Sequence, residues 1–193
     1  MTVDIYWGSG SPFAWSVMLA LELKGVPYNS HLLSFSDGDL KTPESLAMNP
    51  RGKVPVVRNG DFTLSESNAI LAWLEKKQPA PALFGSTAEG TGVIWRAVLE
   101  HAAYFQHHTH GISGAVFYKK MDEMRDEVRE SAKAVGEEMD RYETALAASE
   151  WLVGSAMSAA DIVAYPHFEL FFRLMARDDV KPEKLGFDSG WAA

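Results

Sequence analysis

The stretch that decides the fold is YWGSGSPFAW, residues 6–15. The residues just before its glycines, 2–7, are mostly β-branched and aromatic, which predicts a strand. Small residues then break the strand, and Ser11-Pro12 is a favourable helix start: Ser is a good N-cap, and Pro lacks an N–H that would have no partner there. Apolar residues at helical spacing follow, and Gly25 ends the predicted helix. We therefore expect Ser11 where a strand ends and a helix begins.

This position gives Ser11 a possible chemical role. A helix N-terminus has about half a positive charge and several N–H groups without intrahelical partners. A hydroxyl there can donate a hydrogen bond to a bound anion. If the anion is a thiolate, the pKa of the parent thiol falls below its usual value of about 8.5. The alternative is that Ser11 only caps the helix.

The composition is that of a globular protein. The chain has 193 residues, of which 47% are hydrophobic and 23% charged, so one large or two small domains are expected. No apolar run approaches the roughly 18 residues of a membrane span, and the first residues lack a signal-peptide pattern. The absence of Cys excludes disulfides, thiolate metal sites and a cysteine nucleophile. We therefore expect a cytoplasmic protein without a membrane partner.

The charge is unevenly distributed. The whole chain has a net charge of −8; residues 1–80 have 7 basic and 8 acidic residues (−1), and residues 81–193 have 11 and 18 (−7). Nucleic-acid affinity comes mainly from neutralising phosphates, so this balance argues against a nucleic-acid partner. The nearly neutral first part is the better place for an anionic ligand.

The first part alternates strands and helices. Strands are predicted over residues 28–35, 54–57 and 62–64, with Asn59-Gly60 as a hairpin signal between the last two. Further helices are predicted to start at Thr42-Pro43 and near Ser65. The resulting order, β-α-β followed by β-β-α, predicts an α/β domain with a mixed four-stranded sheet and helices on its faces.

The rest of the chain is predicted to be all helical. We expect domains at residues 1–78 and 88–193, joined by a Pro/Ala-rich linker at 79–87. Helical patterns cover 88–118, with a Gly-Ile-Ser-Gly interruption near 111–114, and 122–148. Ser158 with Asp161 predicts a capping box before another apolar helix, and a short helix is expected after Pro182.

Three features of the first domain indicate a binding groove for a small peptide. Val54-Pro55 opens a strand, and a cis bond there would turn the Val54 backbone outward to pair with an extended ligand. Glu66-Ser67 lies at a helix start, where N–H groups bind a carboxylate and Glu66 balances an ammonium group. A second carboxylate would meet the basic residues of the nearby loops, which are Lys41, Arg51 and Lys53. Each feature also has a purely structural explanation: a trans Pro55, a Ser65 cap and solvated lysines.

These motifs together resemble the cytosolic glutathione S-transferase superfamily. The resemblance rests on NPRGKVPV at residues 49–56 and LSESNAI at 64–70, and more weakly on SAADI at 158–162. It implies a thioredoxin-like N-terminal domain and an all-helical bundle after it. It also implies that glutathione is held by Lys41, Lys53, Val54, cis-Pro55, Glu66 and Ser67.

The resemblance leaves two candidates for the hydroxyl that stabilises the thiolate. Ser11 aligns with the catalytic Ser of the theta, phi and zeta classes, and Tyr6 with the catalytic Tyr of the alpha, mu and pi classes. We favour Ser11 because it caps the helix, whereas Tyr6 is otherwise a strand residue with its ring in the core. Leu40 stands where the Ser classes usually have His. The missing Cys argues against the beta and omega classes.

The electrophile site is expected on a helix of the second domain. His101, Tyr104, Phe105 and His108 have the spacing of one helical face, and in the family this helix lines the electrophile pocket together with residues such as Phe13. The alternative is that Tyr104 and Phe105 fill the core. His107, His108 and His110 do not have metal-ligand spacing, so no metal is expected.

The resemblance implies a glutathione transferase that conjugates the tripeptide to a small apolar electrophile in detoxification. Glutathione would be the cosubstrate, with no other cofactor, and the chain would form a homodimer through residues 59–75. Two alternatives stay open: a non-catalytic binding protein of the same fold, and a glutathione-dependent peroxide or disulfide reductase.

Overall fold

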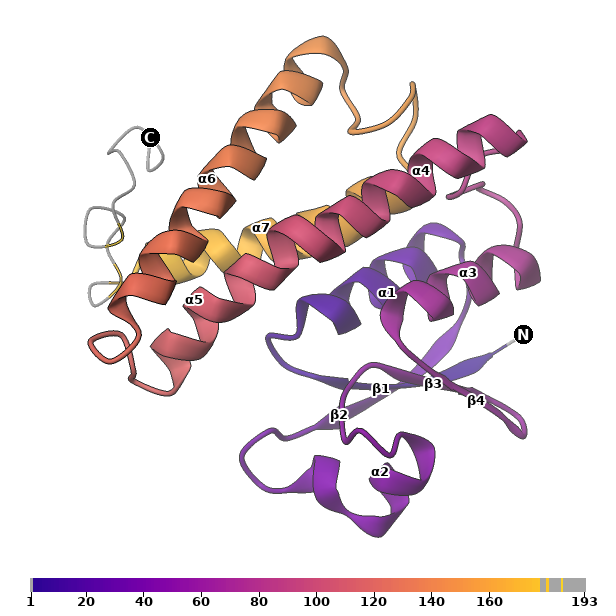
Figure 1. Ribbon diagram of the computed structural model, residues 1–193. Helices are drawn as coiled ribbons and strands as arrows, with labels where there is room; N and C mark the ends of the chain where they lie inside the picture. Colours follow the sequence, from indigo (N-terminus) through magenta and orange to yellow (C-terminus); the bar gives the residue numbers. More distant parts are fainter. Residues whose placement is uncertain (1, 178–179, 181–184, 186–193) are drawn as a thin grey trace. The chain divides into compact units, whose positions relative to one another are not determined.

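The computed structural model describes residues 2–177, 180 and 185. The chain forms two compact units, Met1–Ser86 and Thr87–Ala193 (Figure 1). The first contains the predicted mixed sheet, and every regular element among the described residues of the second is helical. The predicted fold class is therefore confirmed.

The sheet of the first unit has the strand order β2-β1-β3-β4. Its strands are β1 (Val3–Gly8), β2 (Tyr28–Leu33), β3 (Val56–Asn59) and β4 (Phe62–Ser65). β1 is parallel to β2 and antiparallel to β3, and β3 is antiparallel to β4. Alternate residues of a strand lie on the same face, and Val3 and Ile5, two positions apart in β1, are both fully buried.

Helices cover both faces of this sheet. Helices α1 (Pro12–Leu23) and α3 (Ser67–Lys77) lie on one face, and the short helix α2 (Pro43–Met48), preceded by the 3-10 turn η1 (Asp39–Lys41), lies on the other (Figure 1). The predicted helix starts are confirmed, because Ser11 Oγ accepts a hydrogen bond from the Ala14 N–H (3.3 Å) and Thr42 caps α2.

Two details of the hairpin differ from the prediction. The strand β3 begins at Val56, so Val54 and Pro55 lie before it. The turn consists of Gly60-Asp61, because Asn59 pairs with Phe62. The turn therefore centres one position later than the predicted Asn59-Gly60. Gly60 has φ +62°, which a residue without Cβ adopts at little cost. Asn59 stays in the strand, and its Nδ2 donates to the Thr2 carbonyl (3.0 Å).

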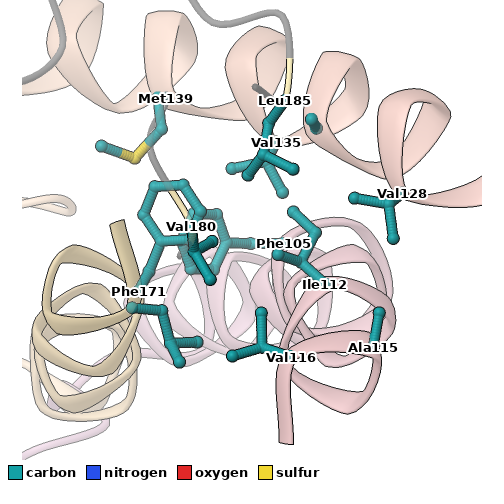
Figure 2. Close-up of a cluster of buried hydrophobic side chains, with 12 residues drawn as sticks. Phe105, Ile112, Ala115, Val116, Val128, Val135, Met139, Phe171, Val180 and Leu185 are labelled. Atoms are coloured by element: carbon teal, nitrogen blue, oxygen red, sulfur yellow. The ribbon is translucent and has the colours of Figure 1, made fainter. Parts of the chain in front are cut away.

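The described part of the second unit contains helices that pack around an apolar core. They are α4 (Ala88–Glu100), the π-helical segment η2 (His101–Gln106), α5 (His107–Phe117), α6 (Arg125–Ala148) and α7 (Ala159–Met175). Figure 2 shows the core, in which Phe105 of η2 and Ile112 of α5 meet Val135 of α6 and Phe171 of α7. Among the described residues, no helix combines the length and apolarity that a membrane span requires.

The interruption predicted at residues 111–114 is wrong. This segment is helical in α5, and the departure from α-helical geometry lies earlier, in η2. Gly111 has a packing role instead, since a Cβ there would lie 3.1 Å from Ser131 Oγ of α6. Helix α6 starts at Arg125, three residues after the predicted start. The helix expected after Pro182 lies outside the described residues.

Candidate active site

The strand register brings three segments of the first unit to one end of the sheet. Tyr6 of β1 pairs with Val56 of β3, and Val56 pairs with Ser65 of β4. The residues that follow β1, precede β3 and follow β4 therefore meet at the same end. These residues include Ser11, Val54 and Ser67, which are 43 and 13 positions apart in sequence but lie at one end of the sheet.

Ser11 is the N-cap residue of α1. Its backbone N–H donates to the Gly8 carbonyl (3.1 Å), which holds the loop between β1 and α1. Its Oγ accepts from Ala14, as described above, so the hydroxyl hydrogen is still available for donation. The side chain is half-buried. Ser11 can therefore cap the helix and donate to a bound anion at the same time, so these two roles are compatible.

Tyr6, the other candidate hydroxyl, lies on the sheet face that α2 covers. Its ring stacks on His31 (4.6 Å between centroids), and the Arg58 guanidinium lies 5.5 Å from its ring centroid. Tyr6 lines a small hollow together with Lys53 and Val54. Burial raises the pKa of Tyr6, which makes its hydroxyl a weaker acid than a free tyrosine.

The Val54–Pro55 peptide bond is cis. Val54 is half-buried and belongs to no strand, while Pro55 is buried. The next residue, Val56, already pairs with both neighbouring strands. Val54 therefore lies just before the start of β3, outside the strand pairing of the sheet.

A rigid turn precedes Val54. Asn49 is 4% exposed, its Nδ2 donates to the Lys53 carbonyl (2.8 Å), and its Oδ1 accepts from the Arg51 N–H (3.1 Å). Gly52 has φ +58°, and a Cβ there would lie 2.9 Å from the carbonyl oxygen of Leu40 and 3.1 Å from Lys41 Nζ. The close approach at Gly52 therefore places the Lys41 ammonium against the turn that contains Lys53.

Glu66 and Ser67 form the start of α3. Glu66 occupies the N-cap position with φ +69°, an unusual angle for a residue with a side chain, and makes no capping hydrogen bond. Its carboxylate is exposed and lies 3.9 Å from Arg51 Nε. Ser67 is the half-buried first residue of the helix. The N–H groups of the first turn are therefore not capped by the Glu66 side chain.

Comparison with known proteins identifies the family. The family model described as "Glutathione S-transferase, N-terminal domain" matches residues 10–77, and "Glutathione S-transferase, C-terminal domain" matches residues 107–178. The chain is 30% identical over 194 residues to "Glutathione S-transferase A" of Pleuronectes platessa, with 94% of this chain and 83% of that protein covered. The chain belongs to the glutathione S-transferase family. It is also 35% identical over 167 residues to "Glutathione S-transferase 4" of Zea mays, with 83% of this chain and 73% of that protein covered.

Solved glutathione transferase structures share the fold. The chain is similar to poplar glutathione transferase F1 with a TM-score of 0.79 and 22% identity, covering 96% of this chain and 90% of that one. A glutathione S-transferase from Pseudomonas fluorescens gives a TM-score of 0.76 at 25% identity, covering 96% and 87%. The glutathione transferase fold that the sequence motifs predicted is therefore confirmed.

The residues predicted to share one face of the second unit do not all do so. His101 and Phe105 are buried and stack on each other (5.1 Å between centroids), whereas Tyr104 is 54% exposed and His108 is half-buried. The physical reason is that segment η2 is a π-helix with i→i+5 hydrogen bonds, so it has more residues per turn than an α-helix. A residue four positions after His101 therefore lies closer to its face than a residue three positions after it. Tyr104 is thereby directed away from His101 and Phe105.

Phe35 is a residue near the candidate site that sequence reasoning missed. Its ring lies across Gly8, where a Cβ would come within 2.4 Å of Phe35 Cζ, and it is 56% exposed. Phe13, which the resemblance assigned to the electrophile site, lies half-buried in the first turn of α1. The first unit thus presents two phenylalanines close to the Gly8–Ser11 loop. The glycine at position 8 is the only sequence signal of the contact with Phe35.

The histidines near residue 108 form no metal cluster. His107 and His108 are in ring contact, and His110 Nδ1 bonds the Gln106 carbonyl (3.0 Å). Within the described part of the chain, no group of three or more His, Cys, Asp or Glu side chains is arranged to hold a metal ion.

Proposed function

We propose that this glutathione transferase joins the glutathione thiolate to a small apolar electrophile, with Ser11 as the thiolate-stabilising hydroxyl. The observation that supports this most strongly is the convergence of Ser11, Val54 and Ser67 at one end of the sheet. A tripeptide needs these three elements close together: a donor for the thiolate, a free backbone edge and an anion site at a helix start.

Each part of glutathione has a partner in this proposal. The Val54 N–H and C=O pair with the cysteinyl backbone. The start of α3, with Ser67, binds the γ-glutamyl carboxylate, and Glu66 binds the ammonium group. Lys41 and Lys53 bind the glycyl carboxylate. The proposed reaction uses glutathione as cosubstrate and needs no metal or other cofactor.

The chemical step needs only a thiolate held in place. The thiol gives its proton to solvent, and the Ser11 hydroxyl donates a hydrogen bond to the resulting thiolate, which lowers the thiol pKa from about 8.5. The sulfur then attacks the electrophilic carbon: a C–S bond forms, and the leaving group departs with its electron pair. Phe13, in the first turn of α1, and Phe35, which lies across Gly8, offer apolar surface for the electrophile.

Ser11 is preferred to Tyr6 on physical grounds. The N-cap hydroxyl lies at the positive end of α1, where a thiolate is favoured. Tyr6, in contrast, lies within strand β1 with its ring stacked on His31 and caps no helix.

The test is glutathione titration by calorimetry, followed by ultraviolet absorbance of the bound thiolate near neutral pH. We expect binding by the wild type, weaker binding by Ser67→Ala, and loss of the thiolate signal in Ser11→Ala but not in Tyr6→Phe. Loss only in Tyr6→Phe would move the role to Tyr6. No binding at millimolar glutathione would favour a non-catalytic protein, and turnover of a disulfide but not an aryl halide would favour a reductase.

We also propose that the chain forms a homodimer through the β3–β4 hairpin and α3. Phe62, at the hairpin, is 45% exposed and stacks on the half-buried Trp73 of α3 (5.6 Å between centroids). Sedimentation equilibrium should give a dimer that Phe62→Glu dissociates and that Phe117→Glu, at an exposed Phe of the second unit, leaves intact. A monomeric wild type would contradict this proposal.

A further inference from the structure

Arg51 and Glu66 form an ion pair at the start of α3. Arg51 Nε lies 3.9 Å from Glu66 Oε1, and the two side chains are 75% and 70% exposed. The sequence motif groups Arg51 with Lys41 and Lys53 as basic loop residues. The structure instead places the Arg51 guanidinium beside the carboxylate that our proposed function assigns to the ammonium of the γ-glutamyl end.

The backbone of Arg51 is held firmly in this place. Its N–H donates to Oδ1 of the buried Asn49 side chain, and Nδ2 of Asn49 donates to the Lys53 carbonyl. The next N–H, of Gly52, donates to the Asn49 carbonyl (2.8 Å). Only the side chain of Arg51 is therefore free to change position when a ligand arrives.

The Glu66 side chain does not cap its own helix. Its φ of +69° is one that residues with a side chain rarely adopt, and its carboxylate caps no N–H group. The first helical hydrogen bond of α3 runs from the Ile70 N–H to the Glu66 carbonyl (2.9 Å). The N–H groups of the three preceding residues have no partner within the helix.

We infer that Arg51 recognises the α-carboxylate of the γ-glutamyl end of glutathione; this inference rests on the proposed function. An α-amino acid group has an ammonium and a carboxylate on the same carbon, and the Arg51–Glu66 pair presents the two complementary charges side by side. Without ligand, Arg51 neutralises Glu66. When glutathione binds, the ammonium takes the place of the guanidinium at Glu66, and the guanidinium turns to the adjacent carboxylate, which its planar fork matches.

The test uses two glutathione analogues that each lack one carboxylate. In 4-aminobutyryl-cysteinylglycine the γ-glutamyl carboxylate is missing, and in the glycyl monoethyl ester the other one is blocked. Because hydrogen bonds to charged groups are strong, Arg51→Gln should raise the Kd of glutathione about 10-fold, and that of the ester by the same factor. It should change the Kd of the aminobutyryl analogue less than about twofold.

Matched variants exclude general charge effects. Arg141→Gln removes another exposed, ion-paired arginine (3.2 Å from Glu138) in α6 and should leave all three Kd values unchanged. Arg51→Lys keeps the charge without the fork and should give an intermediate Kd for glutathione. Melting temperatures should be equal throughout, because Arg51 is mostly exposed.

Two results would overturn the inference. A Kd for glutathione that Arg51→Gln leaves unchanged shows that Arg51 takes no part in binding. An effect that disappears with the glycyl ester, or that is equal for the aminobutyryl analogue, assigns Arg51 to another part of the ligand. A wild type that does not bind glutathione at all would instead contradict the proposed function itself, so the two failures are distinguishable.

Discussion

The Lys24 ammonium lies 2.6 Å from Glu75 Oε2, across fifty-one positions of the chain. It also donates to the carbonyl oxygens of Gln78 (2.8 Å) and Pro81 (2.6 Å), so all three of its N–H bonds are used. The Glu75 carboxylate accepts from the Leu83 N–H (3.1 Å) as well. This buried pair therefore binds the segment after α3 to the end of α1, within the first unit.

Lys24→Met is predicted to destabilise the protein strongly. The Lys24 side chain is fully buried and that of Glu75 is 14% exposed, so the variant leaves a largely buried carboxylate and two carbonyls without their donor. Removing one partner of a buried ion pair costs about 3–5 kcal/mol. The free energy of unfolding in urea measures this loss.

The control for this prediction is Lys133→Met. The Lys133 side chain is 81% exposed, and its ion pair with Glu137 is long, at 4.0 Å. We expect a change below about 0.5 kcal/mol there. Lys24→Met/Glu75→Leu should recover part of the stability, since no unpaired charge remains. Equal effects of Lys24→Met and Lys133→Met would show that the buried pair does not stabilise the fold.

Acid is predicted to destabilise the chain through two buried histidines. Burial lowers the pKa of His167 from its usual 6.5 to about 4, and burial, with His167 nearby, lowers the pKa of His101 well below its usual value. The folded state thus keeps both rings neutral, whereas the unfolded chain takes up protons below pH 6.5. The stabilisation is complete above about pH 6.5 and is lost as the pH falls toward 4, by about 3 kcal/mol for His167.

Unfolding in urea between pH 7.5 and 4.5 tests this prediction. Carboxylates titrate in part of the same range, so the relevant quantity is the difference between variant and wild type. His167→Gln should lose less stability on acidification than the wild type, and His107→Gln, at an exposed position, should follow the wild type. Parallel pH profiles for all three proteins would contradict the prediction.

Gly52→Ala is predicted to weaken both stability and glutathione binding. An added Cβ would meet the Leu40 carbonyl oxygen at 2.9 Å and would displace Lys41 from the turn. Gly60→Ala is the matched control, since Gly60 has a similar φ (+62°) but nothing within 4 Å. It should cost about 1–2 kcal/mol of stability from backbone strain alone and leave the Kd of glutathione unchanged. A Gly52→Ala variant with wild-type affinity would argue against a role for this turn.

The capping box of α7 gives a graded prediction for stability. Asp161 Oδ2 accepts from the Ser158 N–H and Oγ (2.8 and 3.0 Å), and Asp161 Oδ1 accepts from the Leu152 N–H (2.8 Å). Asp161→Ala should therefore cost about 2–3 kcal/mol, and Ser158→Ala about 1 kcal/mol. Ser155→Ala, at an exposed position, should cost almost nothing. Unfolding free energies in the reverse order would show that Asp161 is dispensable.

Local features of the fold were predictable because they depend on neighbouring residues. The caps at Ser11, Thr42 and Ser158 each involve a hydrogen bond to a residue two or three positions away, so sequence spacing is sufficient. The hairpin was predicted one residue too early, because the choice between Asn59-Gly60 and Gly60-Asp61 depends on the pairing of Asn59 with Phe62.

The errors in the helical unit come from features that residue spacing does not show. The glycines at 111 and 114 suggested a break, yet Gly111 is helical and lets Ser131 of α6 approach. The π-helical segment η2 has no counterpart in the apolar spacing, so Tyr104 was placed wrongly on the face of His101 and Phe105. The approach of α6 to Gly111 explains the first feature, and the π-helical geometry of η2 explains the second.

The sequence by itself determined the family, the order of elements and the segments that form the candidate site. These follow from short motifs such as NPRGKVPV and from the local rules of caps and turns. Only the tertiary structure decided that Ser11, Val54 and Ser67 share one end of the sheet, that Arg51 lies beside Glu66, and that Lys24 is buried against Glu75. Such relationships depend on strand register and on side chains distant in sequence meeting in space, which no local pattern specifies.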